Sequence, residues 1–149
     1  MNPCECGHTK DIHFFGDNVD LSTPCMANGC ACKGFKPYHT IYRGAKYSPT
    51  AGPGAVTKQK PNLAPMIFNP APSQKVWNHS PDGFSWGFCG SGPAQLALAL
   101  LLDVTDDGKL ATFLHQRFKA EIVANWGESW EISSDEINAW VENNKDTGL

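Results

Sequence analysis

Thiol and imidazole side chains gather near the beginning of the chain, in a pattern typical of a metal site. Five of the six cysteines fall within the first 32 of the 149 residues, together with two histidines. Zinc prefers four thiolate or imidazole ligands in a tetrahedron, and such a site stabilises a segment too short to build its own core. The sequence therefore predicts one structural zinc ion, with ligands drawn from Cys4, Cys6, His8, His13, Cys25, Cys30 and Cys32.

The sequence leaves the exact ligand set open, because seven candidates exceed the four that one ion needs. We favour one ion that uses one or both cysteines of each Cys-x-Cys pair, completed by Cys25 or His13. Two ions that share the seven ligands are the alternative. The spacing differs from that of a two-Cys two-His finger, so it does not predict DNA reading. A catalytic zinc keeps an open position for water, which this dense ligand set argues against.

A second stretch with chemical potential is residues 78–96, "NHSPDGFSWGFCGSGPAQL". Its Gly-Ser-Gly-Pro run precedes an apolar helix, and free N–H groups at a helix start favour a phosphate or carboxylate. No Lys-Ser or Lys-Thr follows the glycines, so the run is not a P-loop. The candidate ligand-binding residues are Arg43, His79, Ser80, Trp86, Gly90, Ser91, Gly92 and Gln95.

A purely structural interpretation of the same stretch stays open. Glycines permit tight turns with positive φ, and the aromatic residues 84, 86 and 88 alternate as in a short strand that packs on the following helix. Cys89 lies beside the predicted helix start, a setting that favours a nucleophile.

The elements that must position these residues indicate an α+β domain, a small antiparallel sheet with about three helices. Six prolines between residues 38 and 77 interrupt the pattern, and we expect an exposed loop over 48–65. Short strands are expected at 39–47, 64–69, 74–77 and 130–132. Helices are expected at 93–103, which is apolar nearly all round, at 109–125, and from a capping box that begins at Ser133.

Composition divides the chain into a Cys/His zinc module over residues 1–36 and an α+β domain over residues 37–149. The net charge is −3, with five bases and no acid between residues 37 and 81 and an acidic C-terminal part. The two segments either neutralise each other or form an anion-binding surface. We expect a cytoplasmic protein without a membrane partner, since the sequence shows no secretory signal and no apolar run of 18 residues.

The run "NHSPDGFSWGFCGSGPAQLALALLLD", with "YRG" upstream and "WEISSDEINAWV" downstream, resembles an uncharacterised family of small bacterial and phage proteins. The resemblance covers roughly residues 40–143, and the cysteine-rich head resembles a separate short zinc-binding module. It implies a prokaryotic or phage source, and it carries no activity. The family usually has Gly where this chain has Cys89, which implies that Cys89 fills space rather than reacts.

These observations predict a non-enzymatic accessory protein with a structural zinc module. Its candidate ligand is small, anionic and nucleotide-like, and it binds at the Gly-Ser-Gly-Pro helix start. The alternative is a zinc-containing module that binds a protein or a nucleic acid. An enzyme of unrecognised type ranks third, because no catalytic constellation is evident. The acidic net charge, and a head without interleaved arginines and aromatic residues, argue against strong nonspecific nucleic-acid binding.

Overall fold

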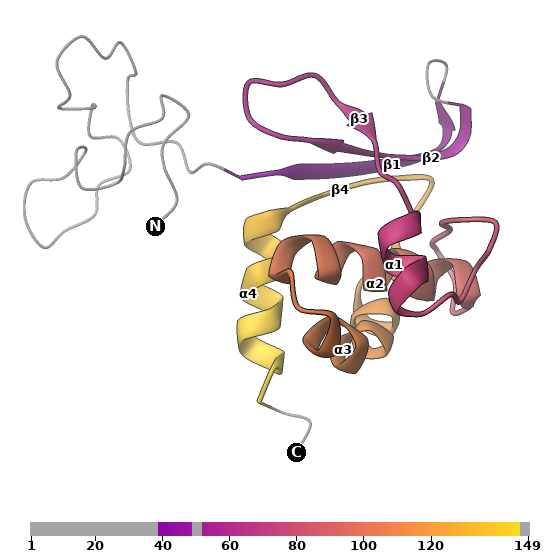
Figure 1. The fold of residues 1–149 in the computed structure, drawn as a ribbon. Helices are drawn as coiled ribbons and strands as arrows, with labels where there is room; N and C mark the ends of the chain where they lie inside the picture. The colour runs from indigo at the N-terminus through magenta and orange to yellow at the C-terminus, as the bar shows by residue number, and fades with distance from the viewer. Residues whose placement is uncertain (1–38, 49–51, 147–149) are drawn as a thin grey trace, which may run out of the picture.

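A computed structural model describes residues 39–48 and 52–146, and this part of the chain forms a sheet with helices against one of its faces (Figure 1). The predicted α+β class and the antiparallel sheet are therefore confirmed. The seven candidate zinc ligands lie outside the described residues, so the zinc module stays a prediction. In the described ranges, no helix is long and apolar enough to cross a membrane.

The sheet has four antiparallel strands in the order β3-β2-β1-β4. Their bounds are Ile41–Ser48 for β1, Gly52–Gln59 for β2, Met66–Ile67 for β3 and Ser129–Ser133 for β4. Side chains alternate between the two faces of a strand. The inner face carries buried Tyr42, Val56, Trp130 and Ile132, which pack toward the helices.

The outer face of the sheet has no helix on it in the described part of the chain (Figure 1). Arg43 follows buried Tyr42 in β1, so its side chain lies on this outer face. There its guanidinium donates to Glu131 Oε2 and to Gln59 Oε1, each at 2.6 Å. The charge of Arg43 is thus balanced across the strands, away from the helices.

Four α-helices form the second layer of the described domain: α1 over Ala71–Val76, α2 over Ser91–Thr105, α3 over Gly108–Glu121 and α4 over Ser134–Asn144. A short 3₁₀ turn, η2, covers Val123–Asn125. Helix α2 is the centre of the core, and every residue from 93 to 101 is buried. The predicted capping box of α4 is confirmed by reciprocal bonds between Ser133 and Glu136.

A polar bridge ties the sheet to the C-terminal end of α2, at Asp103. The Tyr42 hydroxyl donates to Asp103 Oδ2, and the Lys58 ammonium lies 2.7 Å from the same carboxylate. Burial, with the Asp103 carboxylate as a further cause, raises the pKa of Tyr42 above its usual value. The ionised phenolate is therefore excluded, and Tyr42 acts as a neutral hydrogen-bond donor.

Part of the predicted loop over 48–65 is wrong, because Gly52–Gln59 forms β2. The β2 sequence contains two glycines, a proline and a single large apolar residue, Val56, so it lacks the alternating pattern typical of a strand. Pairing with β1 supplies the missing stabilisation. Pro53 pairs with Tyr47 at a part of β2 that β3 does not reach, where a missing N–H donor is tolerated.

Two other predicted strands are also wrong. Residues 74–77 belong mainly to α1, which begins after Asn69 and Pro70. The side-chain Oδ1 of Asn69 accepts a hydrogen bond from the Ala71 N–H at 2.9 Å. Residues 84–88 form no strand, because none of the described strands pairs with them and their backbone turns at Gly87. Contacts with other parts of the fold, rather than the local pattern, therefore determine the structure of both segments.

Candidate functional site

The side-chain amide of Gln95 joins three segments beneath the surface of the molecule. Gln95 is fully buried in the second turn of α2. Its Oε1 accepts from the backbone N–H groups of His79 and Ser80 at 2.7 and 3.0 Å. Its Nε2 donates to Ser73 Oγ in α1 and to the Trp77 carbonyl at 2.8 and 3.2 Å. All four hydrogen-bonding positions of the amide are therefore used, and the loop after α1 is fixed to α2.

This clamp brings His79 against His115 of α3. Their Nε2 atoms are 2.9 Å apart, and the ring of Trp77 stacks on His79 with a centroid separation of 4.5 Å. His115 Nδ1 lies 2.6 Å from the Thr112 carbonyl oxygen, which can only accept. Neutral His115 therefore carries its proton on Nδ1, and its Nε2 accepts the hydrogen bond from His79 Nε2–H.

The surroundings favour the neutral form of both imidazoles. Burial lowers the pKa of His115 below its usual value, and the neighbouring His79 and Lys119 lower it further against an opposing hydrogen bond to Thr112. Burial and the positive charge of Lys119 also lower the pKa of His79. At neutral pH both imidazoles are therefore uncharged.

The glycine-rich segment over residues 83–92 packs closely against the core. The buried indole of Trp86 donates to the Gly127 carbonyl at 2.8 Å. Gly87 has φ +84, and a Cβ built on it would lie 2.9 Å from the Trp126 carbonyl oxygen. A Cβ on Gly92 would lie 2.6 Å from Ser85 Cβ. The backbone at Ser85 therefore packs closely against Gly92 in the first turn of α2.

Helix α2 begins without a side-chain cap. The N-cap residue is Gly90, and the first turn contains no acidic residue. Among the described residues, neither the Ser91 nor the Gly92 N–H has a hydrogen-bond acceptor, and the first bonded amide is that of Ala94, to the Gly90 carbonyl at 3.1 Å. In contrast, Asp107 caps α3 with its side chain. The positive end of the most buried helix is therefore left with two unsatisfied donors.

An aromatic ring lies at this helix start, and an ammonium group lies beside Gly87, four residues before Ser91. Phe88 is 52% exposed, and its ring lies so close that a Cβ on Gly90 would be 2.6 Å from Phe88 Cε2. Lys46 Nζ would lie 4.0 Å from a Cβ on Gly87. Cys89 is an exposed free thiol between Phe88 and Gly90. The arrangement offers an aromatic face, two N–H donors and a nearby positive charge.

A family model described as "Family of unknown function (DUF6166)" matches residues 42–143. The chain belongs to the DUF6166 family. The predicted resemblance to an uncharacterised family is therefore confirmed over this span. No curated protein and no solved structure matches the chain.

Within this DUF6166 domain, the predicted ligand-binding residues do not all meet at one place. His79 and Ser80 are held by Gln95, and Gly90, Ser91 and Gly92 form the helix start. Trp86 is buried, so its ring face is covered by protein. Arg43 lies on the outer face of the sheet with Glu131. The structure thus brings together the glycine run and separates Arg43 from it.

Two residues outside the predicted set, Lys46 and Phe88, lie where Arg43 and Trp86 were expected. Lys46 is on the same strand as Arg43 and three residues later, and this odd spacing puts it on the inner face, beside Gly87. Phe88 is the exposed aromatic residue at the loop, two residues after Trp86. The alternation along β1 was the available signal for Lys46. His115 carried no signal, because its partner His79 lies 36 residues away.

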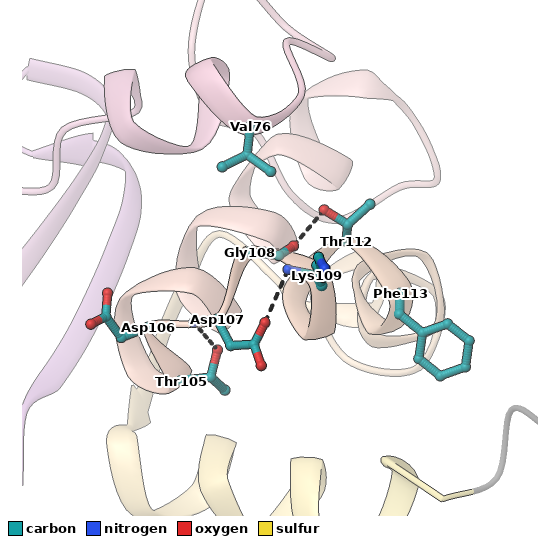
Figure 2. Close-up of a pocket in the computed structure, with 8 residues that line it drawn as sticks. All are labelled: Val76, Thr105, Asp106, Asp107, Gly108, Lys109, Thr112 and Phe113. Carbon is teal, nitrogen blue, oxygen red and sulfur yellow. Dashed lines mark hydrogen bonds between the residues drawn. The ribbon is translucent and has the colours of Figure 1, made fainter.

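A shallow groove lies on another side of the helical layer, between the end of α1 and the start of α3. Figure 2 shows half-exposed Val76 and Phe113 on its walls, with Asp106, Asp107 and Lys109 around them. The Asp107 carboxylate is occupied as the cap of α3, accepting from the Lys109 N–H at 3.0 Å. The groove is therefore apolar at its walls and carries both signs of charge at its rim.

Proposed function

We propose that this DUF6166 chain is a non-enzymatic accessory protein that binds a small anionic, nucleotide-like ligand at the start of α2. The observation that supports this proposal is the uncapped helix start, where the Ser91 and Gly92 amides have no acceptor among the described residues. A phosphate there would accept from both amides and lie at the positive end of a buried 15-residue helix.

The neighbours of the helix start favour a nucleotide over a bare anion. The half-exposed ring of Phe88 offers a face on which a base stacks, and such contacts contribute about 1–3 kcal/mol per base. Lys46 of β1 adds a positive charge beside Gly87, four residues before Ser91. Gln95 and Trp86 hold the loop in this shape and make no ligand contact in our proposal.

We expect Ser91→Asp to abolish ligand binding while it stabilises the free protein. The new carboxylate would occupy the position of the ligand anion, next to the two free amides, and raise the free energy of unfolding by about 0.3–1 kcal/mol. The measurement is the melting temperature with and without a panel of nucleoside mono-, di- and triphosphates. Wild-type protein at 100 times the dissociation constant gains about 2.7 kcal/mol, whereas Ser91→Asp gains almost none.

Ser91→Ala is the matched control, because it removes the hydroxyl and keeps both backbone donors. It should retain most of the nucleotide-dependent stabilisation. A nucleotide that stabilises Ser91→Asp as much as wild type would contradict the site, and a wild-type protein that no member of the panel stabilises would contradict the ligand class.

We also propose that the N-terminal cysteine-rich module holds one structural zinc ion. Full-length protein purified under reducing conditions should contain about one zinc per chain, and chelation should abolish the order of the first 36 residues, as followed by amide hydrogen exchange. Zinc-free protein with an equally protected head would contradict this part of the proposal.

The groove of Figure 2 favours a second candidate function, the binding of a protein partner. Val76 and Phe113 are 42% and 51% exposed, and apolar walls with a charged rim are typical of small protein interfaces. This candidate gains weight if the nucleotide panel leaves the melting temperature of wild type unchanged.

A further inference from the structure

The imidazole pair between the loop after α1 and helix α3 has a geometry that suits a metal ion as well as a shared proton. His79 Nε2 and His115 Nε2 are 2.9 Å apart and come from different elements, the loop after α1 and helix α3. Adjacent ligands of a square or octahedral ion with bonds of about 2.0 Å are roughly 2.9 Å apart. Rotation of both rings toward a point beside the line that joins the two nitrogens would direct both at one ion.

His115 is already in the tautomer that metal binding requires. Its Nδ1 donates to the Thr112 carbonyl, so the lone pair of Nε2 faces His79. Metal-bound histidines typically donate their other ring N–H to a carbonyl or carboxylate in this way, which fixes the ring and raises its basicity. The buried His115 is thus a rigid donor, whereas His79, on the loop, can adjust.

A third possible ligand lies beside the pair. His79 is only partly buried, and the side-chain amide of Gln116 lies 3.3 Å from His115 Nε2. The oxygen and nitrogen of such an amide are interchangeable by a flip, so Gln116 can offer an oxygen donor. No group of three or more His, Cys, Asp or Glu side chains suitable for a metal is found in the described residues, so water would complete the coordination.

We propose that His79 and His115 form a binding site for a divalent late transition metal ion, of the Ni²⁺, Cu²⁺ or Zn²⁺ class. Neutral imidazole is a preferred ligand of these ions. The ion lies beside the line that joins the two Nε2 atoms, because the midpoint of that line is too close to both for bonds of about 2.0 Å. His79 moves its proton from Nε2 to Nδ1, and Trp77, stacked on His79, shields one side of the site. This site is separate from the cysteine-rich head, which we expect to hold zinc.

The test is a titration of the full chain, first loaded with one equivalent of zinc, with Ni²⁺ and ¹⁵N NMR detection. Paramagnetic broadening should begin at the amides of residues 77–80 and 112–116, and the fluorescence of Trp77 should be quenched in parallel. His79→Gln should weaken Ni²⁺ binding at least tenfold. His39→Gln, which removes an imidazole near Asp135, is the matched control and should leave the binding constant unchanged.

The broadening map needs no variant, so the proposal stays testable if a substitution impairs folding. Broadening that spares residues 77–80 and 112–116 would overturn the proposal, as would equal Ni²⁺ affinities of wild type and a folded His79→Gln. Quenching that persists in Trp77→Phe would show that the ion binds elsewhere and would also overturn it.

Discussion

Gln95→Leu is expected to lower the free energy of unfolding by about 3 kcal/mol or more. The substitution keeps a similar volume, but it leaves the His79 and Ser80 N–H groups, the Trp77 carbonyl and the Ser73 hydroxyl without their partner. Each buried polar group left unsatisfied costs about 1–3 kcal/mol, and water entering the loop recovers part of that cost. Urea unfolding followed by circular dichroism measures the change.

Gln116→Leu is the control for this prediction, because Gln116 is exposed on α3. Its free energy of unfolding should stay within about 0.5 kcal/mol of wild type. If Gln95→Leu lowers the free energy of unfolding by less than about 1 kcal/mol, the loop is not held by this amide, and the position of His79 would need another cause.

Gly44→Ala is expected to have an effect of similar size, about 3 kcal/mol. Gly44 faces Trp130 across β1 and β4, and a Cβ at this position would lie 2.3 Å from Trp130 Nε1 and 2.4 Å from Cε2. The Trp130 ring cannot move easily, because two other indole rings pack against it. Trp126 stacks on it with a centroid separation of 4.0 Å, and Trp86 contacts it edge-on with a centroid separation of 5.8 Å. Overpacking of this kind typically costs 1–3 kcal/mol and occasionally more.

Gly127→Ala is the matched control for Gly44→Ala. A Cβ on Gly127 meets nothing within 4 Å, so the same chemical change should alter the free energy of unfolding by less than about 0.5 kcal/mol. Equal midpoints of urea unfolding for the two variants would contradict the packing of Gly44 against Trp130.

Local signals in the sequence were sufficient for the three longer helices, α2, α3 and α4, and for β4. The apolar run over 93–103 and the Ser133–Glu136 capping box depend on neighbours within one turn, and both predictions are confirmed. The predicted helix over 109–125 is confirmed as α3, with its last residues in the η2 turn. These elements carry their own pattern, so tertiary contacts reinforce it.

The elements that were mispredicted depend on contacts between distant residues. Strand β2 has little alternation of its own and exists through its register with β1. Helix α1 is only six residues long, which is marginal for an isolated helix, and Ser73 receives a hydrogen bond from Gln95, 22 residues away. A local pattern contains neither contact.

The candidate site shows the same division between local and distant information. Free N–H groups at the start of α2 were expected from the order Gly-Ser-Gly-Pro, but the helix was expected to begin at Pro93 with Ser91 or Gly92 as its cap. It begins two residues earlier, at Ser91, with Gly90 as the N-cap residue and no side-chain cap. The role of Gln95 was not predictable, because a polar residue in an apolar helix gives no indication of the four groups that it joins. Placing Arg43 at the site failed to take account of the strict alternation of side chains along β1.

The most direct test of the proposed ligand site is a ¹⁵N NMR titration of zinc-replete protein with AMP and, separately, with inorganic phosphate. We expect the amide protons of Ser91 and Gly92 to shift downfield first with both ligands, because they become hydrogen-bond donors. Phe88→Ala should weaken AMP binding about tenfold and leave phosphate binding unchanged. Ser91 and Gly92 resonances that stay in place at saturating concentrations of both ligands would contradict the proposed site.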